Sequence, residues 1–180
     1  MKKALLCLLL MTSIVGFVNA QKIYSTKIGQ VKFNATANGP KIVGINNQVD
    51  SKMAEKNGQI IFNILIKGFK FDNQFMEDHF NENYMESSKF PKADFKGFIK
   101  NISTINFSKD GNYNVTAEGD LTIHGVTKKV TVQGVLTVAG GKVSITASFK
   151  VNLKEYGVGD FHVGKEIANE ADIALNCKYE

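Results

Sequence analysis

The sequence predicts an all-β fold: a closed barrel of eight antiparallel strands with one short inserted helix at about residues 74–86. The first observation is that apolar and polar residues alternate over most of the chain after residue 20, as in strands with one buried face. The second is that turns containing glycine or asparagine separate these segments, which predicts antiparallel hairpins. Eight such strands would close into a barrel, which removes exposed sheet edges and leaves an interior wide enough for one small ligand.

The first twenty residues form a segment of a different kind. Two lysines precede an uncharged run over residues 4–18, which ends at Val18-Asn19-Ala20. This order of features is typical of a secretory signal peptide, and the run is too short and too early for a membrane span. We expect cleavage after Ala20, export to the periplasm or the medium, and a single barrel domain over residues 21–180.

Each strand is predicted from the apolar residues that share one of its faces. In chain order these are Val31, Phe33 and Ala35; Val43, Ile45 and Val49; Ile60, Phe62, Ile64 and Ile66; Ala93, Phe95 and Ile99; Tyr113, Val115, Ala117, Leu121 and Ile123; Val130, Val132, Leu136 and Val138; Val143, Ile145, Ala147, Phe149, Val151 and Leu153; and Ala171, Ile173, Leu175, Cys177 and Tyr179. The inward faces are therefore aliphatic and aromatic, and they either pack against one another or surround an apolar cavity.

The inserted helix interrupts this alternation. Phe75, Phe80 and Tyr84 recur at roughly helical spacing, Asp72 is the expected N-cap, and Pro91 cannot continue a helix. These aromatic residues belong to a longer row that is either a lid over a cavity or part of a packed core. The row comprises Phe69, Phe71, Phe75, Phe80, Tyr84 and Phe90.

Charge and cysteine content narrow the function classes. The 22 basic residues are all lysines, scattered among 17 acidic residues, so no basic stripe with arginine forks indicates nucleic-acid binding. Cys177 is the only cysteine after residue 20, which excludes an intrachain disulfide in the mature chain. It is expected to be a buried apolar side chain, and the alternatives are a reactive thiol or a thiol that links a homodimer.

A stretch near the middle of the chain carries a family resemblance. "GDLTIHGVTKKV", residues 119–130, resembles the signature of the YceI-like family, and residues 76–97 and 151–159 are also similar to that family. The resemblance implies an exported bacterial protein with a lipocalin-like barrel. It also implies a carrier without catalytic activity, which holds a long-chain amphiphile such as a polyisoprenoid or an isoprenoid quinone. The chain has Met76 and Leu153 where the family often has arginine, so two polar anchors for a head group are missing, and Lys129 replaces a common proline.

The three histidines are the main candidates for other chemistry. His124 is predicted to be a hairpin corner bonded to a backbone carbonyl, because no nucleophile or acid lies at recognisable spacing. His79 shares a helical face with Glu82, and His162 follows Asp160 by two residues. These pairs supply too few ligands for a typical zinc site, so we expect His79 to contact a ligand head group instead.

The sequence thus predicts a carrier that binds the apolar chain of a lipid inside the barrel, with no cofactor, no nucleic-acid partner and no integral membrane span. The alternatives are a filled barrel that binds proteins on its outer surface and, less favoured, a histidine-dependent metalloenzyme. The predicted wall residues are Ile64, Ile66, Phe95, Val115, Leu121, Val132, Ile145 and Phe149, and the predicted entrance residues are Phe75, His79, Phe80 and Tyr84.

Overall fold

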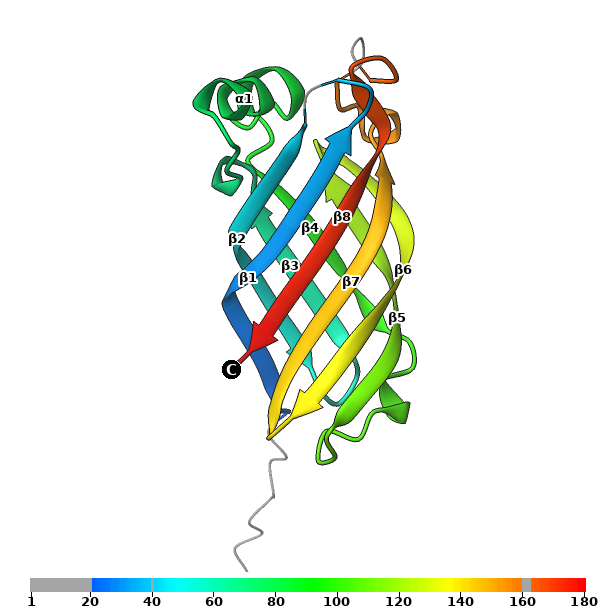
Figure 1. Cartoon of the computed structure of the whole chain (residues 1–180). Coiled ribbons are helices and arrows are strands. Elements are labelled where there is room, and N and C mark those ends of the chain that lie inside the picture. Colours follow the sequence, from blue (N-terminus) through cyan, green and yellow to red (C-terminus); the bar gives the residue numbers. More distant parts are fainter. Residues whose placement is uncertain (1–20, 40, 160–162) are drawn as a thin grey trace, which may run out of the picture.

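The protein is a closed barrel of eight antiparallel strands (Figure 1), seen in a computed structural model that describes residues 21–39, 41–159 and 163–180. Neighbouring strands follow chain order, and the first pairs with the last. The predicted fold class is therefore confirmed, whereas the predicted signal peptide lies outside the described residues. The strands are β1 (Ile23–Thr36), β2 (Val43–Ala54), β3 (Gln59–Leu65), β4 (Lys92–Ile99), β5 (Gly111–Ile123), β6 (Val126–Ala139), β7 (Lys142–Asn152) and β8 (Ile167–Tyr179).

One predicted strand face is wrong. Val49 is fully buried, but Gly44 and Asn46 take the inward positions before it, so Val43 and Ile45 lie on the opposite face. The register against β1 shifts between Asn46 and Val49, and a bulge of this kind reverses the side-chain alternation.

The buried Asn46 side chain fixes this bulge. Its Nδ2 donates to the carbonyl oxygen of Leu65 at 2.8 Å, and its Oδ1 accepts from the backbone N–H of Gln48 at 2.7 Å. A polar residue thus replaces an apolar one on the inner face, which is why counting apolar residues put β2 in the wrong phase.

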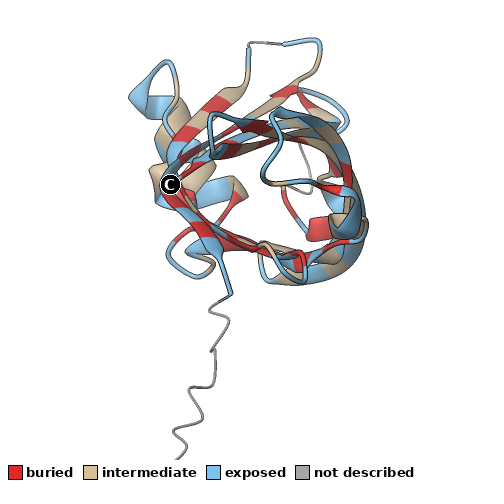
Figure 2. Cartoon of the chain, turned by 90° about the horizontal axis from the view of Figure 1, so that it is seen from below, coloured by how far each residue is buried: buried red, intermediate tan, exposed pale blue. Residues whose placement is uncertain are grey.

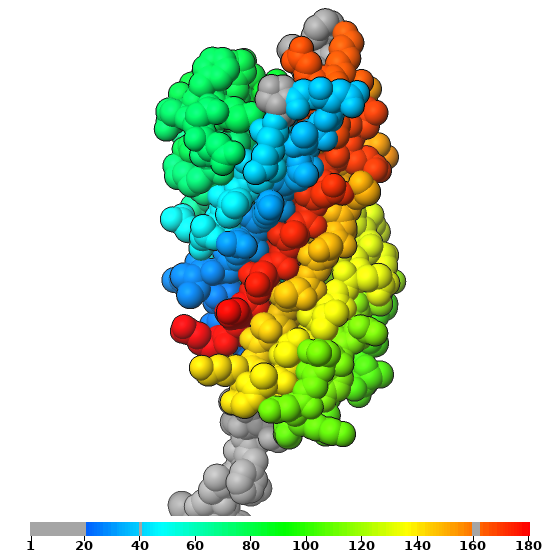
Figure 3. Space-filling model, viewed as in Figure 1, coloured from blue at the N-terminus to red at the C-terminus, as the bar shows by residue number. Residues whose placement is uncertain are grey.

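The inserted helix lies beside one end of the barrel, called the upper end from its position in Figure 1. It consists of α1 (Gln74–His79) continued by a wider turn, η2 (Phe80–Tyr84). Asn73, rather than the predicted Asp72, is the N-cap, because its Oδ1 accepts from the backbone N–H of Met76 at 2.9 Å. Figure 3 shows this part of the chain standing out beside the upper ends of β1 and β2.

The lower end of the barrel is filled with side chains. A short turn, η3 (Ile102–Thr104), lies between β4 and β5 at this end, and just beyond it the Phe107 ring stacks on Tyr24 at a centroid distance of 5.5 Å. The hydroxyls of Ser51 and Tyr179 share a hydrogen bond of 2.9 Å inside the wall. Cys177 is fully buried nearby, as predicted for an apolar side chain. Figure 2, seen from below, shows buried and exposed residues alternating along the strands.

Within the described part of the chain, no helix has the length and apolar character needed to cross a membrane.

Candidate functional site: an apolar cavity at the upper end of the barrel

A cavity of about 640 Å³, called here the upper cavity, occupies the upper end of the barrel. Its wall comes from β1, β3, β4, β5, β7 and β8, and its cover comes from α1, η2 and the segment before β8. Nearly all lining side chains are apolar, among them Val31, Ile64, Leu121, Ile123, Phe149, Val151, Leu153, Ile167 and Ile173. The space therefore suits an apolar chain and offers little to a polar molecule.

Four phenylalanine rings form an aromatic cluster at one side of this cavity. The Phe80 ring, from η2, stacks on Phe33 of β1 at a centroid distance of 5.3 Å and lies 5.0 Å from Phe71 and 5.5 Å from Phe69. The cluster joins the helical segment to the barrel wall. These rings line the upper cavity and also pack with the hydrophobic core, to which Phe69 itself belongs, so the cluster shares features of both alternatives, and a role as a lid stays a prediction.

A second, smaller cavity of about 90 Å³ lies deeper in the barrel and is called the lower cavity. Five residues line both cavities and so mark the boundary between them: Val31, Ile64, Leu121, Phe149 and Ile173. Below this level the interior is filled by fully buried residues such as Leu136.

All twelve predicted site residues line one of the two cavities. Phe95, Val115, Val132 and Ile145 line the lower cavity. Ile66, Phe75, His79, Phe80 and Tyr84 line the upper cavity alone, and Ile64, Leu121 and Phe149 line both. The structure thus places the eight predicted wall residues on the inner surface of the barrel and the four predicted entrance residues in its cover, where Phe75 and His79 are exposed, and their role in binding stays a prediction. Phe75 is the least enclosed of them, with 71% of its surface exposed at the rim.

Part of the upper wall was not among the predicted site residues. Phe33, Val151 and Leu153 lie on faces that alternation had marked as inward, so the signal for them was present. Val163 lies in the turn before β8 and Ile167 is the first residue of β8, and the sequence around them shows no periodic pattern. Their contribution depends on how this turn folds over the barrel.

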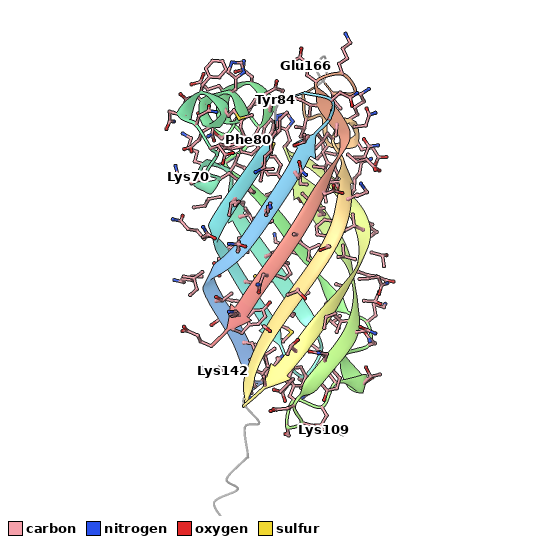
Figure 4. All side chains as sticks on the ribbon, in the orientation of Figure 1. Lys70, Phe80, Tyr84, Lys109, Lys142 and Glu166 are labelled. Carbon is pink, nitrogen blue, oxygen red and sulfur yellow. The ribbon has the colours of Figure 1, made fainter. Side chains whose placement is uncertain are left out.

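The polar lining residues of the upper cavity come from its cover. His79, Asn83 and Tyr84 come from α1 and η2, and Glu166 comes from the turn before β8. Burial, and secondarily the negative charge of Glu166, raise the pKa of the Tyr84 hydroxyl. Figure 4 shows Phe80, Tyr84 and Glu166 together at this end of the barrel.

His124 occupies the tight turn between β5 and β6, as predicted. Both His124 (φ 50°) and Gly125 (φ 76°) have positive φ, as the two-residue turn between paired Ile123 and Val126 requires. The predicted bond to a backbone carbonyl is wrong, because the ring Nε2 donates to Glu86 Oε2 at 3.0 Å. Glu86 lies 38 positions earlier in the chain, too far for spacing to reveal it.

Phe90 also belongs to this corner and not to the aromatic cluster. Its ring meets the edge of the His124 imidazole at a centroid distance of 4.5 Å. The His124–Glu86–Phe90 contact therefore attaches the end of the helical segment to the β5–β6 hairpin.

The described residues contain no group of three or more histidine, cysteine or acidic side chains that could hold a metal ion. His79 and Glu82 are both exposed, and the pair His162 and Asp160 lies outside the described residues. Burial raises the pKa of the Cys177 thiol to about 12, so this thiol is poorly placed for chemistry in the folded protein.

The fold and the cavity define a β-barrel with an apolar internal chamber that opens under a helical cover. The chain belongs to the YceI-like family, because the model of the YceI-like domain matches residues 18–179. Among curated proteins, none matches this sequence.

Two solved structures share the fold at low sequence identity. A polyisoprenoid-binding domain from Saccharophagus degradans superposes with a TM-score of 0.75 at 8% identity, covering 89% of this chain and 99% of that domain. BcnA from Burkholderia cenocepacia superposes with a TM-score of 0.66 at 17% identity, covering 82% of this chain and 94% of BcnA.

Proposed function

We propose that this protein is an exported, non-enzymatic carrier that encloses the apolar chain of a lipid in its upper cavity. The observation that carries the proposal is the size and lining of that cavity. Its volume of about 640 Å³ lies within the range of about 300–1,000 Å³ that is usual for small-molecule sites. The enclosing residues are almost entirely apolar, so burial of hydrocarbon is the interaction they can supply.

The energetics favour a long chain over a small apolar molecule. Each buried methylene contributes about 0.8 kcal/mol, so ten of them contribute about 8 kcal/mol. Association itself costs at least about 4 kcal/mol. A chain of ten carbons would bind weakly, and a chain nearer twenty would bind tightly without any polar contact.

Membership of the YceI-like family and the shared fold of a polyisoprenoid-binding domain support an isoprenoid chain as the ligand class. The leading segment with its uncharged run supports export to the periplasm or the medium. In this proposal the protein performs no bond-making step, and its mechanism is removal of the chain from water.

Native mass spectrometry of the exported protein tests the proposal. The full precursor is expressed, the mature protein is recovered without detergent, and bound molecules are extracted with organic solvent. We expect the protein mass of a chain over residues 21–180, together with a reproducible added mass that extracts as a lipid. A bare protein mass, with no uptake of added isoprenoid alcohols or quinones, would refute the carrier function.

A further inference from the structure

The helical segment belongs to an excursion of the chain between β3 and β4 that is tied down at both of its ends. At the first end Lys70 and Ile45 of β2 exchange two backbone hydrogen bonds, at 2.8 and 3.0 Å. At the second end the carbonyl oxygen of Pro91 accepts from the backbone N–H of Ile66 at 2.9 Å. Residues 72–90, called here the flap, lie between these two ties and include the α1 and η2 residues that cover the upper cavity. The flap can therefore pivot without breaking either tie.

Glu86 and His124 join the far end of the flap to the turn between β5 and β6. Their side chains meet at 3.0 Å, and neither is among the described residues that line either cavity. Their chain neighbours Met85 and Ile123 do line the upper cavity. The contact therefore holds a piece of the cover against a piece of the wall from outside the cavity.

The backbone at both residues of this contact has an uncommon conformation. Among the described residues, Glu86 (φ 42°) and His124 (φ 50°) are the two that have positive φ without being glycine. Glu86 directly follows Met85, the C-cap of η2, at a position where glycine is the usual residue. His124 takes a position in a two-residue hairpin turn where glycine or asparagine is usual. Longer side chains are disfavoured at such positions, so the bond between their ends gives a physical reason for both.

The strength of this contact suits a reversible attachment. The Glu86 side chain is 46% exposed and that of His124 is 12% exposed, so solvent screens the bond in part. The Phe90 ring adds an apolar contact at the same corner, where it packs on His124 and closely against Gly125. A contact of this kind contributes modestly to stability, so it can break without unfolding the barrel.

We propose, on the basis of the carrier function above, that the Glu86–His124 pair is a latch whose release lets the flap swing about its ties and open the upper cavity to a lipid chain. The pair acts by positioning the flap and does not touch the chain. Because the latch is the same in the empty and the loaded protein, loosening it raises the open fraction of both equally. It therefore sets the rates of uptake and release and leaves the affinity unchanged.

The accessibility of a thiol inside the cavity tests the latch in the absence of added lipid. Val151→Cys places a thiol at a buried position of β7 that lines the upper cavity, whereas Cys177 is a buried thiol outside both cavities. Both thiols are labelled with a maleimide, and labelling at each site is followed by peptide mass. Adding Glu86→Gln or His124→Asn should speed labelling of the introduced thiol by about two- to tenfold and leave labelling of Cys177 unchanged.

A matched control removes a different ion pair from the same hairpin. Asp120→Asn disrupts the 3.3 Å contact with Lys129, which lies on the outer face of the barrel and outside both cavities. It should change the labelling of neither thiol. Equal acceleration of both thiols in the latch variants would show that these substitutions only destabilise the barrel. An unchanged rate at the introduced thiol would show that the contact does not hold the flap, and either result overturns the latch.

Lipid kinetics connect the latch to the carrier function. Uptake and release of a fluorescent long-chain alcohol are measured by stopped flow on the unmodified protein and on each latch variant. We expect both rate constants to rise by the same factor, about two- to tenfold, with the Kd changed by less than about twofold. A changed Kd with unchanged rates would overturn the proposal.

The outcomes separate this proposal from the one it rests on. If the unmodified protein takes up lipid and the latch variants behave as it does, the carrier function stands and the latch is wrong. If the unmodified protein takes up no lipid, the carrier function fails, and the role of the latch in uptake fails with it.

Discussion

Under the proposed function, we expect the volume of the upper cavity to limit the chain length that still adds affinity. A chain carbon at liquid density takes up about as much space as a water molecule, about 30 Å³. The 640 Å³ of this cavity therefore holds about 20 carbons. For a series of linear alcohols we expect the affinity to rise nearly fourfold for each added methylene, from about 0.8 kcal/mol each, and to stop rising near that length.

Filling part of the cavity should move this limit by a calculable amount. Ala93 is buried on β4 and lines the upper cavity, so Ala93→Phe adds six ring carbons to the enclosed space. The longest chain that still gains affinity should fall by about six carbons, to about 14, since each ring carbon displaces roughly one chain carbon. Ala174→Phe, at an exposed position of β8, adds the same group outside the cavity and should not move the limit.

The assay is displacement of a fluorescent probe by the alcohol series, performed on the three proteins side by side. Thermal unfolding of each protein shows that both variants are folded before their affinities are compared. A limit that stays near 20 carbons in folded Ala93→Phe would show that the chain does not occupy this cavity. An affinity that is independent of chain length in the unmodified protein would refute burial as the source of binding.

Three further predictions concern the barrel itself. Gly97→Ala should lower the free energy of unfolding, measured in urea, by about 1–3 kcal/mol, because a Cβ there would press on the backbone of β5. Gly111→Ala should change it little, since a Cβ at that position would have no neighbour closer than 3.6 Å. Equal effects of the two substitutions would contradict this packing. Burial raises the pKa of Cys177 from its ordinary value of 9.0 to about 12, so the folded protein keeps a proton that the unfolded chain loses. The free energy of unfolding should therefore decrease as the pH rises above about 9, by up to about 1.4 kcal/mol per pH unit. Urea titrations at alkaline pH should show a smaller decrease for Cys177→Ala than for the unmodified protein. The same slope in the two proteins would refute the role of the Cys177 proton. A double-mutant cycle combines Glu86→Gln with His124→Asn, where asparagine is chosen because it tolerates the positive φ of this position. The two substitutions should be coupled by about 0.5–1.5 kcal/mol. Purely additive losses would show that the 3.0 Å contact between His124 and Glu86 contributes nothing to stability.

The strand architecture was predictable because one physical rule operates along most of the chain. In β5, β6 and β7 the inward residues follow a strict alternation, and the turns between these strands have the glycines that positive φ requires. In β2 the rule failed at Asn46, because a hydrogen-bonded amide took the place of an apolar side chain and a bulge followed it. Local alternation contains no information about which polar residue will be buried by a bond to a distant segment.

The site was predictable to the extent that it belongs to the strands. Ile64, Leu121 and Phe149 were identified from alternation alone, and the structure places them between the two cavities. Glu166 and the His124–Glu86 contact were not identified, because they depend on how separate segments meet at the upper end. The sequence also could not show whether the inward faces met one another, since a filled interior and a hollow one need the same apolar residues.

Under the proposed function, the two ends of the barrel divide stability from binding. Below the cavities the interior holds fully or almost fully buried side chains such as Met53, Leu136 and Val138, and dense packing of this kind supplies stability. At the upper cavity Phe33, Phe80 and Phe149 are only partly buried, because they line that space. An apolar cavity makes fewer contacts than a filled core, so under the proposed function an enclosed apolar chain would supply contacts that the wall residues of this end do not make among themselves. Dense packing at the lower end offsets the missing contacts, and in the proposed carrier the binding of a chain at the upper end would add stability by mass action.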